Sequence, residues 1–214
     1  MSGLSAAFDR IATFGKILSF NCQASRANKP VDLVYIDDMA HKSAEIANEF
    51  LRKPGALGRL TQMQLQKLAY ISHGWNLAIN GEALVLDPVE AWDYGPVFPE
   101  LYQHAKFFGR NPITREITPS DNDAVAFFLS PEIRKDKKPY QAKLSASEKD
   151  IIDRVWNRFG NFSAFQLSEL THKPDTPWYQ TYFTRGKSAV INSKVIRSHY
   201  ENLARLGLNE PHIA

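Results

Sequence analysis

The 214-residue chain has one cysteine, Cys22, and this scarcity excludes several classes of protein. A single thiol forms no intrachain disulfide and no cysteine-rich zinc site, and it suits a reducing cytoplasm. The sequence also lacks an apolar run near the ~20 residues that span a bilayer. Asp9, Arg10 and Lys16 interrupt the apolar residues at the N-terminus, which is not typical of a signal peptide. The sequence therefore predicts a cytoplasmic protein without a membrane segment.

Sequence motifs of common enzymes are also missing. The chain has no GxxxxGK[ST] phosphate loop, no GxGxxG and no HExxH zinc pattern. Ser72 precedes His73, but it belongs to a predicted helix and not to the strained turn of a serine hydrolase. We expect His73 and His172 to hydrogen-bond buried groups. The sequence predicts no catalytic residue, no cofactor and no metal, and an enzyme built from scattered residues is the alternative.

The charge of the chain is nearly balanced, at +3 from 26 basic and 23 acidic residues. This net charge is too small to indicate nucleic-acid binding by itself. Near the C-terminus, however, five basic residues face one acid, Glu201: Arg185, Lys187, Lys194, Arg197 and Arg205. We interpret this stretch as a solvated helix face, and a patch that docks an acidic partner or phosphate is the alternative.

Apolar periodicity predicts a mainly α fold, a compact multi-helix domain. The best-defined helix begins at Thr61, which forms a capping-box pattern with Gln64, and it ends near Asn80. One face of this helix carries residues at three- and four-residue steps: Leu65, Leu68, Ala69, Ser72 and Trp75. Further helices are predicted near residues 4–20, 99–108, 145–160 and 193–207. A second capping box is predicted at Ser145 and Glu148, and a third at Ser163 and Gln166.

A small β-hairpin is predicted between this helix and the turn Tyr94-Gly95-Pro96-Val97. Its strands would be the apolar runs 83–86 and 89–92, paired around Asp87-Pro88. Pro96 fixes φ and restricts Gly95, so the turn is expected to present Tyr94 and Val97 rigidly.

Aromatic residues cluster around this turn, and aromatics are common anchors of interfaces. The candidate partner-binding residues are Gln66, Lys67, Tyr94, Val97, Phe98 and Tyr102. For Trp75 and Trp92 we favour the hydrophobic core. Gln66 and Lys67 are expected on the polar side of the helix, where they either contact a partner, face solvent or cap the neighbouring turn.

Several separated segments, in order, resemble the Panacea domain of bacterial and phage antitoxins. The first two matching segments are LQKLxYxxHGWxL and AWxYGPVxPxxY, which begin at Leu65 and Ala91. Residues 44–51 resemble the opening helix of the family, and LSxLTH with Pro177-Trp178 resembles its closing motif. The matching residues that we expect to be structural are Leu65, Tyr70, His73, Gly74, Trp75, Trp92, Gly95, Pro96, Pro99, Ser168, Thr171, His172, Pro177 and Trp178. The resemblance covers about residues 43–205, so we divide the chain into an extension, 1–40, and a Panacea-like domain, 41–214.

The resemblance implies an α-rich antitoxin that neutralises a cognate protein toxin, usually encoded by an adjacent gene, by direct binding and without catalysis. SocA-like members also act as proteolytic adaptors that deliver a client to a AAA+ protease, and GepA-type members are phage-associated proteins. An adaptor and a phage-associated regulator with a nucleic-acid role are therefore the alternatives. Homo-oligomers are a further option, because the predicted helix in the extension either packs on its own domain or forms a partner-binding or dimerising arm.

Overall fold

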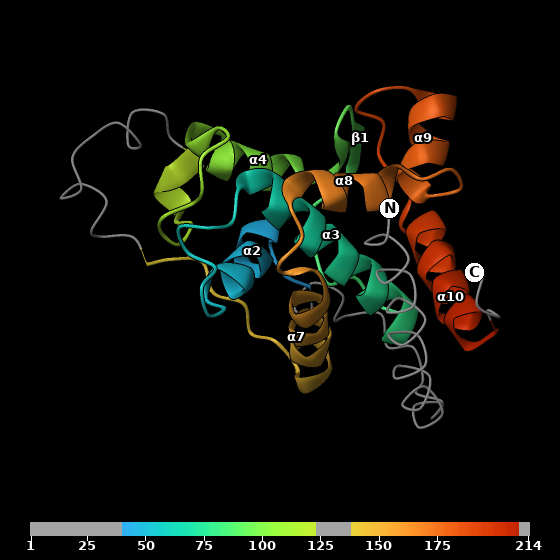
Figure 1. Ribbon diagram of the computed structural model, residues 1–214, viewed down its shortest axis with the longest axis horizontal. Helices are drawn as coiled ribbons and strands as arrows, with labels where there is room; N and C mark the ends of the chain where they lie inside the picture. Colours follow the sequence, from blue (N-terminus) through green and yellow to red (C-terminus); the bar gives the residue numbers. More distant parts are fainter. Residues whose placement is uncertain (1–39, 123–137, 210–214) are drawn as a thin grey trace, which may run out of the picture.

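The structure is a computed structural model that describes residues 40–122 and 138–209 (Figure 1). It is mainly α-helical with one small hairpin, as the sequence predicts. The α-helices are α2 (Ser43–Leu51), α3 (Gln62–Ile79), α4 (Pro99–Ala105), α7 (Ala146–Phe159), α8 (Ala164–His172), α9 (Pro177–Arg185) and α10 (Ser193–Asn209). The strands are β1 (Glu90–Trp92) and β2 (Gly95–Val97), and the 3-10 helices are η1 (Lys106–Phe108) and η2 (Pro119–Asn122). The helix predicted near residues 4–20 lies outside the described residues.

Local capping signals in the sequence set the helix starts. At α3, the Thr61 N–H donates to Gln64 Oε1 at 2.9 Å, and the Gln64 N–H donates back to Thr61 Oγ1 at 3.4 Å. The same reciprocal pair opens α7 at Ser145 and α8 at Ser163. These three capping predictions are therefore confirmed.

Helix α9 was not predicted from the sequence. Its start has a local signal, because Thr176 accepts from the Tyr179 N–H at 3.2 Å and Pro177 fills the first helical position.

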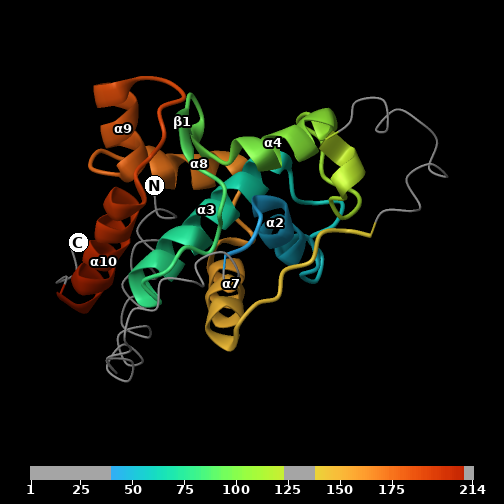
Figure 2. The same cartoon turned by 180° about the vertical axis from the view of Figure 1, so that it is seen from behind.

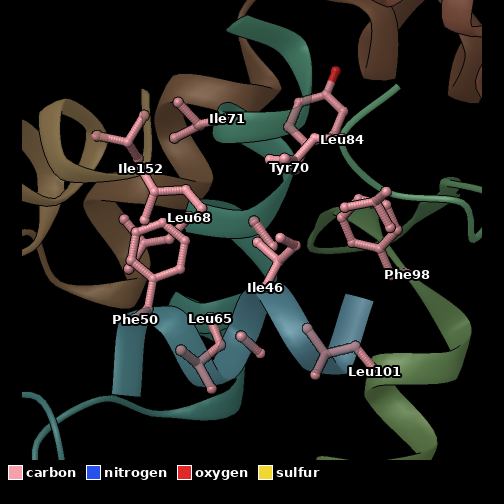
Figure 3. Packing of buried hydrophobic residues seen from close by; sticks show 14 of the residues in the cluster. Ile46, Phe50, Leu65, Leu68, Tyr70, Ile71, Leu84, Phe98, Leu101 and Ile152 are labelled. Atoms are coloured by element: carbon pink, nitrogen blue, oxygen red, sulfur yellow. The ribbon is translucent and has the colours of Figure 1, made fainter. Parts of the chain in front are cut away.

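Helix α3 forms the centre of the fold, with α2, α4, α7, α8, α10 and β2 packed around it (Figures 1 and 2). Every residue from Gln64 to Leu77 is buried, so the expectation of a polar side on this helix is wrong. Figure 3 shows how Ile46 and Phe50 of α2 meet Leu65 and Leu68 of α3. Each such side chain contributes about 1.5–3 kcal/mol when fully buried.

Helix α10 docks on α3 through Tyr200, which packs where α3 has a glycine. A Cβ at Gly74 would lie 2.1 Å from the Tyr200 ring, so only glycine lets the two helices approach this closely. The Tyr200 ring also packs edge-on against Trp75, with ring centroids 5.3 Å apart. Asn192 caps α10, accepting from the Lys194 N–H at 2.8 Å. The predicted end at Gly207 is wrong by two residues, since the helix continues to Asn209.

The hairpin is present, but its predicted pairing is wrong. Strand β1 pairs antiparallel with β2, so that Ala91 faces Pro96 and Trp92 faces Gly95. The run 83–86 instead forms an isolated parallel β-bridge, in which Val85 pairs with His41. The His41 N–H donates to the Leu84 carbonyl at 2.9 Å. Asp93 and Tyr94, and not Asp87-Pro88, therefore form the hairpin tip.

Candidate partner-binding site

The tip of the hairpin is the part of the predicted site that faces solvent. Tyr94 is 72% exposed, whereas the three β2 residues that follow it are all buried. The tip lies where α8 and α9 meet the hairpin, as seen in both Figures 1 and 2. A buried base with an exposed aromatic end is a geometry suited to holding a contact residue in place.

Two buried polar residues of α3 fix the base of the hairpin. Gln66 brackets the backbone of Phe98: the Phe98 N–H donates to Gln66 Oε1 at 2.8 Å, and Gln66 Nε2 donates to the Phe98 carbonyl at 3.1 Å. Lys67 Nζ donates to the Pro96 carbonyl at 3.0 Å. The two side chains are only 3% and 1% exposed, so each caps the neighbouring turn, which was one of the alternatives for them.

Lys67 is buried, and no carboxylate in residues 40–122 and 138–209 is hydrogen-bonded to its ammonium. Burial alone lowers the pKa of its ammonium from 10.5 to about 7. The lysine is therefore close to losing its proton at neutral pH, because apolar surroundings disfavour the charged form.

Gly95 allows the hairpin to lie directly on α3 and α8. Its φ is +103°, and a Cβ there would lie 2.7 Å from Lys67 Nζ and 2.9 Å from Thr171 Oγ1. The His172 ring is equally close, with Cε1 at 3.0 Å. Both the backbone angle and the space therefore require glycine.

Side chains of α8 and α9 lie against the carbonyl groups of three successive residues at the tip. Trp178 Nε1 donates to the Trp92 carbonyl at 2.8 Å, and Ser168 Oγ donates to the Tyr94 carbonyl at 3.2 Å. Between them, His172 Nε2 lies 3.2 Å from the Asp93 carbonyl oxygen. We call these three side chains, Ser168, His172 and Trp178, the clamp.

The side chain of Asp93 adds a further tie between the tip and α9. Its carboxylate accepts from the Tyr182 hydroxyl at 2.8 Å and from Lys187 Nζ at 2.5 Å. The Lys187 hydrogen bond is the main cause that lowers the pKa of this exposed carboxyl. Two residues of the predicted basic stretch therefore have acidic partners: Lys187 pairs with Asp93, and Arg197 pairs with Glu201.

Exposed aromatic rings occur on each of the elements that meet at the tip. Phe165 of α8 is 70% exposed and Phe183 of α9 is 65% exposed. The Ser168 hydroxyl donates to the Tyr94 carbonyl, and Phe165 lies three residues before Ser168 on α8. Because helix positions three apart are neighbours on the helix surface, Phe165 lies on the part of α8 that is near the hairpin tip. The Phe183 ring lies edge-on to the Trp178 ring, with ring centroids 6.3 Å apart. We call Tyr94, Phe165 and Phe183 the aromatic surface.

The other predicted residues are buried or half-buried. Val97 is 7% exposed and Phe98 is fully buried, while Tyr102 is half-buried with its ring 5.0 Å from that of Trp92. Trp75 is in the core as predicted, whereas Trp92 is only half-buried. The remaining motif residues also lie in packed positions: Leu65, Tyr70, His73, Gly74, Gly95, Pro96, Pro99, Thr171 and Pro177.

Both motif histidines bind backbone groups, as expected. His73 Nδ1 accepts from the Val85 N–H at 3.2 Å, and burial lowers the pKa of His73 to about 4. In residues 40–122 and 138–209, no group of three or more His, Cys, Asp or Glu side chains is placed to bind a metal ion. Within the same ranges, no helix is long and apolar enough to cross a membrane.

Sequence reasoning missed Asp93, Phe165, Tyr182 and Phe183. Phe165 and Phe183 gave no periodic signal, because each is an apolar residue on an exposed face of a short helix. Tyr182 and Asp93 are far apart in sequence, and only the packing of α9 beside the hairpin brings them together.

Comparison with known proteins gives two matches and one negative result. The family model described as "Antitoxin SocA-like, Panacea domain" matches residues 65–179, which contain most of α3, the hairpin and the clamp. The Antitoxin SocA of Caulobacter vibrioides (strain NA1000 / CB15N) is 31% identical over 146 residues, covering 66% of this chain and 71% of that protein. No solved structure matches the chain.

Proposed function

Because this chain belongs to the SocA-like antitoxin family with a Panacea domain, we propose that it neutralises a protein toxin by binding it directly. The toxin is expected to be the product of an adjacent gene, and the complex to form in the cytoplasm. Neutralisation of this kind needs only a stable interface that covers the toxin or holds it inactive. An interface of standard size, roughly 1,600 Å² in total, is sufficient for such a complex.

The observation that carries the proposal is the exposed Tyr94 on a hairpin whose tip is held by donors at the Trp92 and Tyr94 carbonyl groups, with His172 beside the Asp93 carbonyl between them. Ordering a loop on binding weakens association, so a tip that is already ordered binds more tightly. Tyrosine on a rigid support is also a frequent hot spot of interfaces. We therefore assign the toxin contact to the aromatic surface, with Tyr94 as its centre.

Gln66, Lys67, Val97, Phe98 and Tyr102 act in this proposal as supports and not as contacts. Gln66 and Lys67 hold the backbone of Phe98 and Pro96, and Val97 and Phe98 are themselves buried at the base of the hairpin. The polar groups of Lys67 and His172 are both used on backbone carbonyls. This use favours a binding role over a catalytic one.

Co-expression of the chain with the product of the adjacent gene tests the proposal. We expect the neighbour alone to stop growth, the pair to grow, and a tagged chain to retain the neighbour through size-exclusion chromatography. Growth arrest that persists despite expression of both proteins would refute the antitoxin role. A toxin that disappears faster in the presence of the chain would indicate the adaptor role instead of sequestration.

A further inference from the structure

An apolar surface pocket of about 740 Å³ lies along α10, at some distance in sequence from the hairpin. Trp75 and Phe159 line it from α3 and α7, and Leu203 and Leu206 line it from α10. Leu206 is still 50% exposed, so the pocket is open to solvent. An apolar hollow of this size is typical of a binding site and is usually covered by a ligand or a protein segment.

The chain itself has one segment with a matching apolar face. Residues 1–39, 123–137 and 210–214 lie outside the described structure. The last of these is short and has a single large apolar residue, Ile213. Segment 123–137 is attached at η2, which packs on α4 and not on α10 (Figure 1).

Near the N-terminus, in contrast, apolar residues recur at helical spacing: Leu4, Ala7, Phe8, Ile11, Phe14, Ile17 and Leu18. At 100° per residue all of them except Ile17 fall within an arc of about 120°, the width of a buried helix face. We propose that residues 4–18 form an amphipathic helix that docks in the α10 pocket of the same chain, with this face inward.

The dimensions agree with this assignment. A helix of 15 residues is about 22 Å long, and the 17 residues of α10 span about 25 Å. Between the segment and the described chain lie residues 19–39, and a chain of that length spans up to about 70 Å when extended. This stretch joins the described chain at Ala40, just before α2, which packs on the same central helix as α10. The segment is therefore long enough to reach the pocket of its own chain.

Disulfide capture tests the docking directly in the full-length chain, in a Cys22→Ser background. Ile11 is the middle residue of the segment, so Ile11→Cys should meet the middle of the pocket in either helix direction. Ser198 and Asn202 are exposed positions of α10 that line the pocket. We expect Ile11→Cys to form an intramolecular disulfide with Ser198→Cys or Asn202→Cys on mild oxidation. The control is Glu100→Cys, an exposed position on α4, which should not be captured at a comparable rate.

Hydrogen exchange supplies a second readout. Phe8→Asp places a charge on the apolar face, and we expect the amides of α10 to exchange roughly tenfold faster than in the unchanged protein. Thr13→Asp is the matched control, because Thr13 lies opposite the apolar arc and should leave exchange unchanged.

Three results would overturn the proposal. Disulfides that link two chains would assign the pocket to a second copy. Protection of α10 that arises only after the toxin is added would assign the pocket to the toxin. Equal capture at Glu100 and the pocket, with no effect of Phe8→Asp, would mean that residues 4–18 do not dock there.

Discussion

Replacing Lys67 by methionine should change how stability depends on pH, because this lysine is buried under the hairpin. In the native chain, burial lowers its pKa from 10.5 to about 7. In the unfolded chain, the side chain is hydrated and keeps a pKa near 10.5. Between these two values only the unfolded chain holds the proton, so native stability rises as the pH increases. Methionine has no proton to gain and keeps most of the apolar stem.

The size of the effect follows from the same two pKa values. Between pH 7 and pH 9.5, the difference in bound protons corresponds to about 3 kcal/mol at 1.36 kcal/mol per pH unit. At pH 9.5 the variant should be less stable than the unchanged protein, since the Pro96 carbonyl loses its donor, a change that costs about 1–3 kcal/mol. At pH 7 that disadvantage should disappear, because the variant also avoids the buried charge.

Urea unfolding of both proteins at several pH values measures this difference, and comparing the two cancels the titration of all other groups. Lys194→Met is the control, since Lys194 is exposed on α10. The reasoning would be refuted if the stability curves of Lys67→Met and the unchanged protein ran parallel from pH 7 to pH 9.5.

Three further substitutions test the packing. Gly95→Ala should lower the free energy of unfolding in urea by about 2–4 kcal/mol, because Gly95 has a positive φ and an added Cβ would overpack the site. Gly109→Ala is the control: Gly109 also has a positive φ but open space around it, so the substitution should cost about 1 kcal/mol in the same titration. Equal losses would contradict the close approach at Gly95. Gly74→Ala should push the Tyr200 ring away from α3 and lower the Tm by roughly 3–10 °C in calorimetry, and an unchanged Tm would exclude this contact. Burial lowers the pKa of His73 from 6.5 to about 4. As the pH falls, this histidine therefore takes up its proton first in the unfolded chain, and about 2 kcal/mol of native stability should be lost between pH 6.5 and pH 4.5. His73→Gln should lack this component in the same unfolding assay, and an identical acid response would contradict it.

The helix starts could be predicted because their signals are local. Thr61, Ser145 and Ser163 each pair with a residue three positions later, so a short window of sequence contains the whole interaction. The end of α10 was harder to predict, because glycine allows a helix to end without forcing it to.

The burial of α3 could not be predicted from periodicity. A helix surrounded on all sides needs buried partners for its polar side chains, and Gln66 and Lys67 find them on backbone groups about 30 residues away. No sequence pattern within the helix predicts that these two side chains bind those backbone groups. The hairpin pairing failed for a similar reason, since Asp87-Pro88 is a good local turn signal, whereas the contacts that fix Asp93 and Tyr94 come from α8 and α9.

The candidate site was therefore predicted in part. Tyr94 is exposed at the hairpin tip, and most of the motif residues around it lie in packed positions, whereas their roles stay a prediction. The exposed rings of Phe165 and Phe183 became candidates only when the fold placed α8 and α9 beside the hairpin.

The most direct test of the proposed toxin contact is the affinity of Tyr94→Ala for the toxin, measured by calorimetric titration together with the Tm of the variant. Tyr94 is exposed, so its removal should leave the Tm nearly unchanged. As a hot spot, it should contribute at least about 2 kcal/mol, which corresponds to roughly 30-fold weaker binding. Leu86→Ala, at another exposed apolar position, is the matched control and should bind normally. Unchanged affinity of Tyr94→Ala, or a loss of affinity that follows a lowered Tm, would contradict the assignment of the toxin contact to the hairpin tip.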